Sequence, residues 1–257
     1  MQLEGRVALV TGGSRGIGRA ICTTLAAQGA AVGVNYRSGK AQADEVVAEI
    51  VAAGGRAVPI EGDVSDFEQA QAAVRQTVSE LGDLHILINN AGIAKDQLIY
   101  NMDPSDWLDV MKVNFGGTFN CSKAALEQFM LNRDGVIVNV SSVMGQRGWI
   151  GESNYAASKG AVNAFTQCAA VEFARFGVRV NAVLPGFSPT DLVGGLLEKD
   201  GGKGIMKQIP MKRFGAVEEI ASVVGFLAGP AAAYVTGSLY VVDGGASTVL
   251  GVGAPLK

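Results

Sequence analysis

Histidine is almost absent from this sequence, because His85 is the single one among 257 residues. One histidine excludes a zinc site with two histidines and a relay of several histidines. A hydrolase with a Ser-His-Asp triad would have to use His85 itself. His85 lies in the apolar run 84–88, which is typical of a buried strand, so we expect a structural histidine at a strand end. We predict no metal site.

Cysteine and positive charge are also scarce. The three cysteines, Cys22, Cys121 and Cys168, are odd in number, widely spaced and form no C-x-x-C pair. This pattern predicts free thiols in a reducing compartment. The 21 Lys and Arg residues against 24 Asp and Glu give a net charge of −3, with no run of basic residues. Nucleic acid and anionic membrane are therefore not expected as partners.

Long hydrophobic runs are missing as well. The early apolar run covers only residues 7–10, so we expect no signal peptide. The longest uncharged stretch, 220–242, contains glycine and proline at 225, 229 and 230, which divide it into a helix, a turn and a short strand. We therefore predict a cytoplasmic protein with no membrane span.

Glycine, in contrast, is abundant, with 35 of 257 residues, and it falls between short apolar runs and longer helical segments. The near-continuous apolar runs predict strands that are covered on both faces. Alternation of strand and helix along the whole chain predicts an α/β fold, a single-domain, Rossmann-type, doubly wound parallel sheet of about seven strands with helices on both faces. The predicted strands are 6–11, 31–36, 57–61, 84–89, 136–141, 178–184 and 239–242. The predicted helices are 17–28, 40–53, 66–80, 104–131, 154–176 and 216–228.

No linker divides the chain, so residues 1–257 are expected to form one dinucleotide-binding and catalytic domain. The segment 188–211 differs from the rest, because it mixes five glycines with apolar residues such as Leu192. We expect it to be a mobile lid over the substrate. The alternative is a small packed helical hairpin.

A glycine-rich turn follows the first predicted strand. Gly12, Gly16 and Gly18, in the spacing G-x-x-x-G-x-G, lie where the strand runs into a helix. Glycines there let the backbone approach a pyrophosphate, and the helix N-terminus offers N–H donors to it. The alternative is that the glycines serve only a tight turn, but their place after the first strand favours a nucleotide site.

The second predicted strand ends at Tyr36, Arg37 and Ser38. Folds that bind NAD place an acidic residue there to hold the ribose 2′-hydroxyl. Here no acid occurs before Asp44, whereas Arg37 and Arg15 can pair with a 2′-phosphate. The sequence thus favours NADP(H), the alternative being that Arg37 is a solvated loop residue.

Tyr155 and Lys159 begin the long predicted helix 154–176 and, being four residues apart, share one face. A cation beside the phenol would lower its pKa and suit it to acid-base work near neutral pH. A second Tyr-x-x-x-Lys pair, Tyr36 and Lys40, contains Gly39 in a turn, and we interpret it as a chance match.

Other polar residues are expected near Tyr155. Ser142 follows the fifth strand and Asn89 ends the fourth, both at the carboxyl edge where open α/β sheets bind ligands. Asn114 interrupts an apolar face of the helix 104–131.

Taken together, these residues resemble the short-chain dehydrogenase/reductase family over essentially the whole chain. The resemblance rests on the glycine turn, Asp63-Val64, 89–92, Asn114, Ser142, Tyr155 with Lys159, Pro185-Gly186 and the closing 242–245. It implies that Tyr155 is the general acid-base, that Ser142 holds the substrate oxygen and that Asn114 anchors a relay water. It gives Lys159 two roles, lowering the tyrosine pKa and binding the nicotinamide ribose. The implied cofactor-binding residues are Gly12, Ser14, Arg15, Gly16, Ile17, Gly18, Tyr36, Arg37, Ser38, Asp63, Val64, Asn89, Ala91, Gly92, Tyr155, Lys159, Pro185, Gly186 and Thr190.

Within that family the chain is most similar to 3-oxoacyl-thioester reductases, which act in fatty acid biosynthesis and related pathways. The resemblance implies an NADPH-dependent ketoreductase acting on an acyl thioester, a homotetramer, and an acyl carrier protein that could bind at Arg133 and Arg175. The expected substrate residues are Ser142, Gln146, Trp149, Glu152 and Leu192. The alternatives are a dehydrogenase of another hydrophobic ketone or secondary alcohol, and a nucleotide-binding sensor without turnover.

Overall fold

The protein is built on one seven-stranded parallel sheet, seen in a computed structural model that describes residues 2–190 and 202–248. The strand order is β3-β2-β1-β4-β5-β6-β7, so the order reverses between β1 and β4. The strands are β1 (Val7–Val10), β2 (Ala31–Tyr36), β3 (Arg56–Glu61), β4 (Ile86–Asn89), β5 (Gly135–Val140), β6 (Val178–Pro185) and β7 (Leu239–Val242). The predicted fold class and each of the seven strands are thereby confirmed, with small shifts at the strand ends.

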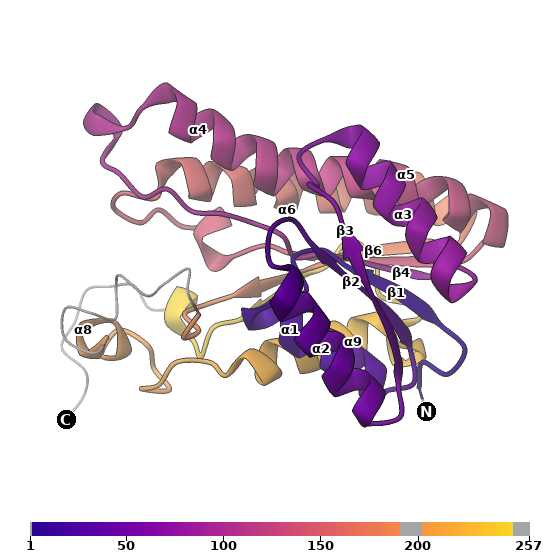
Figure 1. Cartoon of the computed structure of the whole chain (residues 1–257). Helices are drawn as coiled ribbons and strands as arrows, with labels where there is room; N and C mark the ends of the chain where they lie inside the picture. The colour runs from indigo at the N-terminus through magenta and orange to yellow at the C-terminus, as the bar shows by residue number, and fades with distance from the viewer. Residues whose placement is uncertain (1, 191–201, 249–257) are drawn as a thin grey trace.

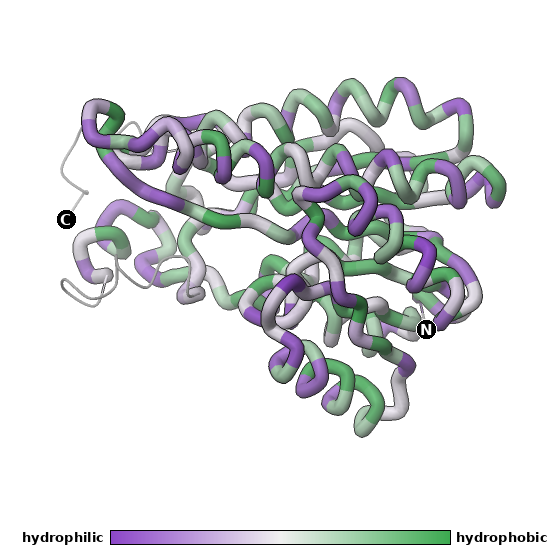
Figure 2. Tube along the Cα trace, turned by 45° about the horizontal axis from the view of Figure 1, so that its top comes forward, coloured by the Kyte–Doolittle hydropathy of each residue, from purple (hydrophilic) through white to green (hydrophobic). Residues whose placement is uncertain are grey.

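Helices cover both faces of the sheet (Figure 1). One face carries α1 (Gly16–Ala27), α2 (Lys40–Ala52) and α9 (Val217–Ala228). The other carries α3 (Phe67–Leu81), α4 (Pro104–Met111), α5 (Gly117–Asn132) and α6 (Ser153–Phe173). Their alternation of hydrophobic and hydrophilic residues, visible in Figure 2, is typical of helices that bury one side against a sheet.

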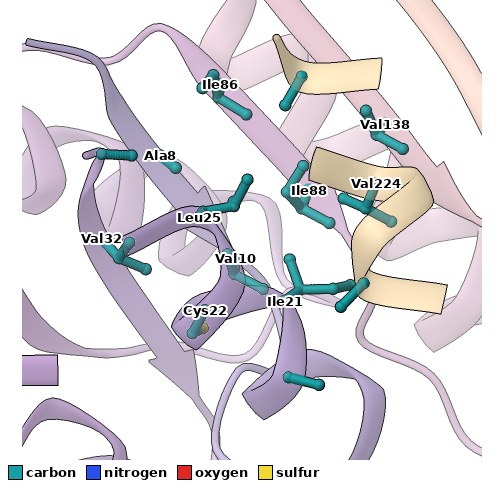
Figure 3. Close-up of a cluster of buried hydrophobic side chains, with 14 of the residues drawn as sticks. Ala8, Val10, Ile21, Cys22, Leu25, Val32, Ile86, Ile88, Val138 and Val224 are labelled. Carbon is teal, nitrogen blue, oxygen red and sulfur yellow. The ribbon is translucent and has the colours of Figure 1, made fainter. Parts of the chain in front are cut away.

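The strands are apolar throughout because neither face of the sheet meets water. Val10 of β1 and Ile88 of β4 are fully buried between the sheet and helices α1 and α9, where they meet Ile21, Leu25 and Val224 (Figure 3). The opposite face forms a second cluster around Leu87 and Phe129. Burial on two faces explains why the strands are continuous apolar runs rather than alternating ones.

The predicted helix 104–131 is interrupted in the structure. Between α4 and α5 lies a π-helical segment, Lys112–Gly116, with Asn114 at its centre. A π-segment widens the helix by one residue per turn and is frequently found at functional sites. Periodicity alone did not reveal it, because the extra residue leaves the apolar spacing on either side intact.

Part of the predicted lid is described. Thr190 precedes the undescribed stretch 191–201, and Lys203–Met206 forms the short helix α8 after it. Leu192 lies outside the described residues. The lid role of 188–211 therefore stays a prediction.

The single histidine and the three cysteines can be located in the structure. His85 accepts a hydrogen bond at Nδ1 from the backbone N–H of Val7 (3.1 Å), as expected for a histidine at a strand end. Cys22 and Cys121 are free and buried, whereas Cys168 is free and exposed. Within residues 2–190 and 202–248, no helix is both long and apolar enough to span a bilayer.

Candidate active site

A cavity of about 750 Å³ lies at the carboxyl ends of the strands, where the strand order reverses. The structure brings nearly all the predicted cofactor residues to its wall, although they come from six separate stretches of chain. The cofactor residues on the wall are Gly12, Ser14, Arg15, Gly16, Ile17, Gly18, Tyr36, Arg37, Ser38, Asp63, Val64, Ala91, Gly92, Tyr155, Lys159, Pro185, Gly186 and Thr190. Of the predicted substrate residues, Ser142 and Glu152 line it too.

The glycine turn has no room for side chains. Gly12 has a φ of +61°, and a Cβ on Gly18 would lie 2.1 Å from the backbone oxygen of Gly12. Asn90 fixes the turn, since its Nδ2 donates to the carbonyl oxygens of Thr11 and Gly12, each at 3.0 Å. The result is a cradle of bare backbone at the start of α1, which fits a pyrophosphate.

The N-terminus of α1 faces the cavity with its positive dipole end. Its N-cap residue is Arg15, whose side chain has no acceptor to offer the first N–H groups, and the first turn carries no acidic residue. An anionic group bound there would be favoured by the helix dipole and by the arginine.

The end of β2 carries positive rather than negative charge toward the cavity. Arg37 is largely exposed, and its guanidinium lies 3.8 Å from the Asp63 carboxylate. Burial alone would raise the pKa of Asp63, but hydrogen bonds from Ser65 and the charge of Arg37 hold it below its ordinary value. The Glu61 carboxyl group is hydrogen-bonded to the Tyr36 side chain. The arrangement fits the 2′-phosphate of NADP.

Tyr155 and Lys159 lie one turn apart on α6, as predicted. The Lys159 Nζ is 5.6 Å from the centre of the Tyr155 ring and donates to the carbonyl oxygen of Val140 at 2.8 Å. Lys159 is almost fully buried, and burial lowers its pKa to about 8. The prediction that the pKa of Tyr155 is lowered is wrong when only the protein's own groups act on it. Burial raises the pKa of Tyr155 well above its ordinary value, and the charges of Glu152 and Asp96 raise it further.

Ser142 lies at the N-terminus of a short 3₁₀ turn, Val143–Gly145. Its Oγ accepts from the backbone N–H of Met144 at 3.1 Å and is hydrogen-bonded to the phenol of Tyr155, which counters the rise in the tyrosine pKa. The serine hydroxyl and the phenol therefore converge on one point of the cavity wall.

Asn114 is buried behind this wall rather than on it. Its Oδ1 accepts from the N–H of Ile93 (2.8 Å), while its Nδ2 donates to the Ile93 carbonyl and to Ser158 Oγ, each at 3.0 Å. Both amide hydrogens are used, so the side chain holds the Ile93 segment against α6. A water molecule bound to Asn114 would therefore have to donate its hydrogen bond to an oxygen atom of this residue.

Three predicted side chains lie away from the cavity. Asn89 is buried, and its Nδ2 donates to Ser122 and to Asn139. Side chains alternate along a strand, so Asn89 points away from the cavity and its neighbour Asn90 lines it. Gln146 is exposed. Trp149 packs edge-on against Phe187, with ring centres 5.5 Å apart. Of these two aromatic residues, Phe187 lines the cavity and Trp149 does not.

Several wall residues were missed from the sequence. Asn90, Asp96, Phe187 and Ser188 all line the cavity. Asn90 could have been found from strand alternation. Asp96 could not, because it lies on the irregular stretch after β4 and is brought to the wall by tertiary contacts.

The parallel sheet, the glycine turn and the Ser-Tyr-Lys group define a Rossmann-type oxidoreductase. Residues 12–247 match the family model described as enoyl-(acyl carrier protein) reductase. The chain belongs to the short-chain dehydrogenase/reductase family.

Named relatives agree with this assignment. A 3-oxoacyl-[acyl-carrier-protein] reductase of Synechocystis sp. is 43% identical over 244 residues, which cover 95% of this chain and 97% of the relative. The Escherichia coli enzyme of the same name is 41% identical over 246 residues, covering 95% and 98%. Among solved structures, a gluconate 5-dehydrogenase from Burkholderia cenocepacia in complex with NADP and tartrate has a TM-score of 0.93 at 33% identity, covering 97% of this chain and 98% of that one.

Proposed function

We propose that this protein reduces 3-oxoacyl thioesters to 3-hydroxyacyl thioesters with NADPH. The observation that carries the proposal is the convergence of Ser142 and Tyr155 at one point of the cavity, with Lys159 beside the phenol. The names of the relatives that match nearly the whole chain support the same substrate class.

Each residue has a distinct role in the reaction. Ser142 donates a hydrogen bond to the keto oxygen and orients it toward Tyr155. Tyr155 gives its phenolic proton to that oxygen as negative charge develops there, and its raised pKa keeps it protonated until that moment. Lys159 then stabilises the phenolate, and Asn114 keeps the Ile93 segment in place.

NADPH supplies the hydride when bound. Residues of the glycine turn and the α1 N-terminus hold its pyrophosphate, and Arg15 and Arg37 pair with its 2′-phosphate. Thr190 and the Pro185-Gly186 turn line the same cavity as Tyr155 and Lys159, and we assign them to the nicotinamide.

Oxidation of a polar secondary alcohol is the second candidate. It is favoured by two carboxyl groups on the wall, Asp96 and Glu152, which could accept hydrogen bonds from hydroxyl groups. The gluconate 5-dehydrogenase from Burkholderia cenocepacia has the same fold.

A homotetramer belongs to this proposal. The outer side of α5 and α6 exposes large apolar residues, with Leu131 at 74% and Val171 at 81% exposure, in addition to Phe119 and Met130. Exposed apolar side chains of this size are typical of a subunit interface around a two-fold axis.

An acyl carrier protein is the proposed carrier partner. Arg133 donates to the backbone carbonyl of Arg175, so the two arginines form one basic patch. They precede the first residues of β5 and β6 and lie at the sheet edge opposite this chain's own cavity. A carrier bound there would serve a cavity only across a subunit interface, which ties the two proposals together. A cytoplasmic location stays a prediction.

The decisive experiment follows NADPH consumption at 340 nm with acetoacetyl-CoA, longer 3-oxoacyl thioesters and, in reverse, gluconate with NADP. Turnover of the thioesters supports the proposal. Inert thioesters with ready oxidation of the polyol would assign the second candidate instead.

A further inference from the structure

Glu152 is a buried carboxyl group whose hydrogen bonding is incomplete. The residue is only 8% exposed, and its Oε2 has no hydrogen-bond partner among the residues that the structure describes. It lines the cavity together with Tyr155. A buried polar atom without a partner costs stability, so its retention on a cavity wall points to a partner in the ligand.

The fold holds a second carboxyl group, that of Asp96, near Glu152. The backbone N–H of Gln97 donates to the carbonyl oxygen of Gly151 at 2.8 Å, and the Asn154 Nδ2 donates to the carbonyl oxygen of Lys95 at 2.9 Å. These two bonds attach the neighbours of Asp96 to residues on either side of Glu152. Asp96 is thereby held at the same part of the wall.

The charges around Glu152 disfavour its ionised form. Burial and the negative charge of Asp96 raise its pKa to about 7. The pKa of Asp96 is raised as well by partial loss of hydration. Tyr155 is uncharged at this pH, and the Lys159 ammonium lies over the tyrosine ring, bound to Val140.

Among the described residues, no cation counters the rise in the pKa of Glu152. The Lys95 ammonium pairs with Asp106 and Asp109, at 2.6 and 2.8 Å. Arg147, on the stretch before α6, is exposed. The Glu152 carboxyl is therefore about half protonated near pH 7 and carries its proton below that pH, and only in the protonated state can it donate a hydrogen bond.

We propose that Glu152 is a specificity-determining residue that, in its protonated form, donates a hydrogen bond to the thioester carbonyl of the substrate. The inference rests on the proposed function. A 3-oxoacyl thioester carries two carbonyl groups separated by one methylene, and both are acceptors only. With the keto oxygen on Ser142 and Tyr155, the second oxygen needs a donor nearby.

The position of Glu152 suits this role. It is the N-cap residue of α6, three residues before Tyr155, and both residues line the cavity. An ionised Glu152 would place a negative charge against the thioester oxygen instead. Substrate affinity then falls as the carboxyl loses its proton.

The test measures KM and kcat for acetoacetyl-CoA between pH 6 and 8.5 in the wild type, Glu152→Gln and Glu152→Leu. In the wild type, KM rises about 3- to 10-fold as pH increases through 7, which is the change in affinity expected from the loss of one neutral hydrogen bond. Glu152→Gln keeps a donor that does not titrate, so its KM stays flat and lies below that of the wild type at pH 8.5. Glu152→Leu has no donor, so its KM is raised about 3- to 10-fold at pH 6 and is also flat.

Asp96→Asn gives an independent check. Removing the neighbouring negative charge lowers the pKa of Glu152, so the rise in KM moves to lower pH. Ionisation of the substrate itself is common to all variants and cancels when they are compared at one pH. NADPH affinity, measured by fluorescence, shows whether each variant is folded.

The outcomes separate this inference from the proposed function. Turnover with a wild-type KM that is independent of pH, or that falls as pH rises, overturns the role of Glu152 alone. A Glu152→Gln KM that follows the wild-type pH dependence also overturns it. Failure to reduce any 3-oxoacyl thioester at any pH overturns both.

Discussion

The ammonium group of Lys159 lies 5.6 Å from the centre of the Tyr155 ring, and both residues belong to one face of α6. The lysine is held by its hydrogen bond to the Val140 carbonyl at the end of β5. Helix and sheet therefore fix the distance between cation and phenol together. This geometry places the acid and its stabilising charge side by side on the cavity wall.

Replacement of Tyr155 by phenylalanine removes only the phenolic oxygen. We expect kcat to fall by about 10²–10⁴-fold, because proton donation to the keto oxygen is lost, while NADPH binding is kept. Tyr234→Phe is the matched control, since Tyr234 is fully exposed and away from the cavity wall. Activity of Tyr155→Phe close to that of the control would contradict the assignment.

The pH dependence of kcat reports on Lys159. Because burial lowers its pKa to about 8, its ammonium is complete below that pH and is lost as pH rises through it. Reduction is therefore expected to slow above pH 8, well before an ordinary lysine would titrate. The measurement is kcat at saturating substrate from pH 6 to 9.5, which separates this effect from that of Glu152 on KM. A kcat that is constant to pH 9.5 would exclude a role for the lysine charge.

Cofactor choice depends on Arg37. Substituting aspartate replaces an attraction to the 2′-phosphate by a repulsion and places a second acid beside Asp63. We expect the ratio of kcat/KM for NADPH over NADH to fall by about 10²-fold or more. Arg56→Asp, an exposed arginine at the first residue of β3, should leave the ratio unchanged. A wild type that already prefers NADH would refute the argument.

The glycine turn is tested by adding a single methyl group. Gly18→Ala would put a Cβ 2.1 Å from the Gly12 oxygen and 2.6 Å from Asn90 Nδ2, so the cradle must open and NADPH affinity should be lost. Gly148→Ala is the control, because nothing lies within 4 Å of its added Cβ. Equal affinity in the two variants, measured by titration calorimetry, would show that the turn does not hold the cofactor.

Assembly is tested on the exposed apolar face of α5 and α6. Val171→Glu introduces a charge at the most exposed of these apolar residues and should dissociate the oligomer, which light scattering detects as a loss of mass. Val51→Glu makes the same change at an exposed valine of α2 on the other face of the sheet and should have no effect. A wild type that is monomeric at micromolar concentration would contradict the proposal.

The sequence by itself determined the fold class, the seven strands and most of the cavity wall. Strands buried on both faces must be continuous apolar runs, and glycines at a strand-helix turn leave a local pattern. The Tyr155–Lys159 pair was equally accessible, because an interval of four residues on a helix fixes a shared face. These features depend on neighbours in the chain.

Only the tertiary structure decided the pKa values in the site and which individual side chains line the cavity. The tyrosine pKa was predicted from one neighbour, Lys159, but burial and the carboxyl groups of Glu152 and Asp96 raise it. Trp149 and Gln146 were expected on the wall, yet Trp149 packs against Phe187 and Gln146 is exposed. Asp96 reaches Glu152 only because two hydrogen bonds join segments more than fifty residues apart. The pKa of a group depends on its burial and on every charge packed around it. Residues that are distant in the sequence contribute to both, so local sequence does not determine the pKa.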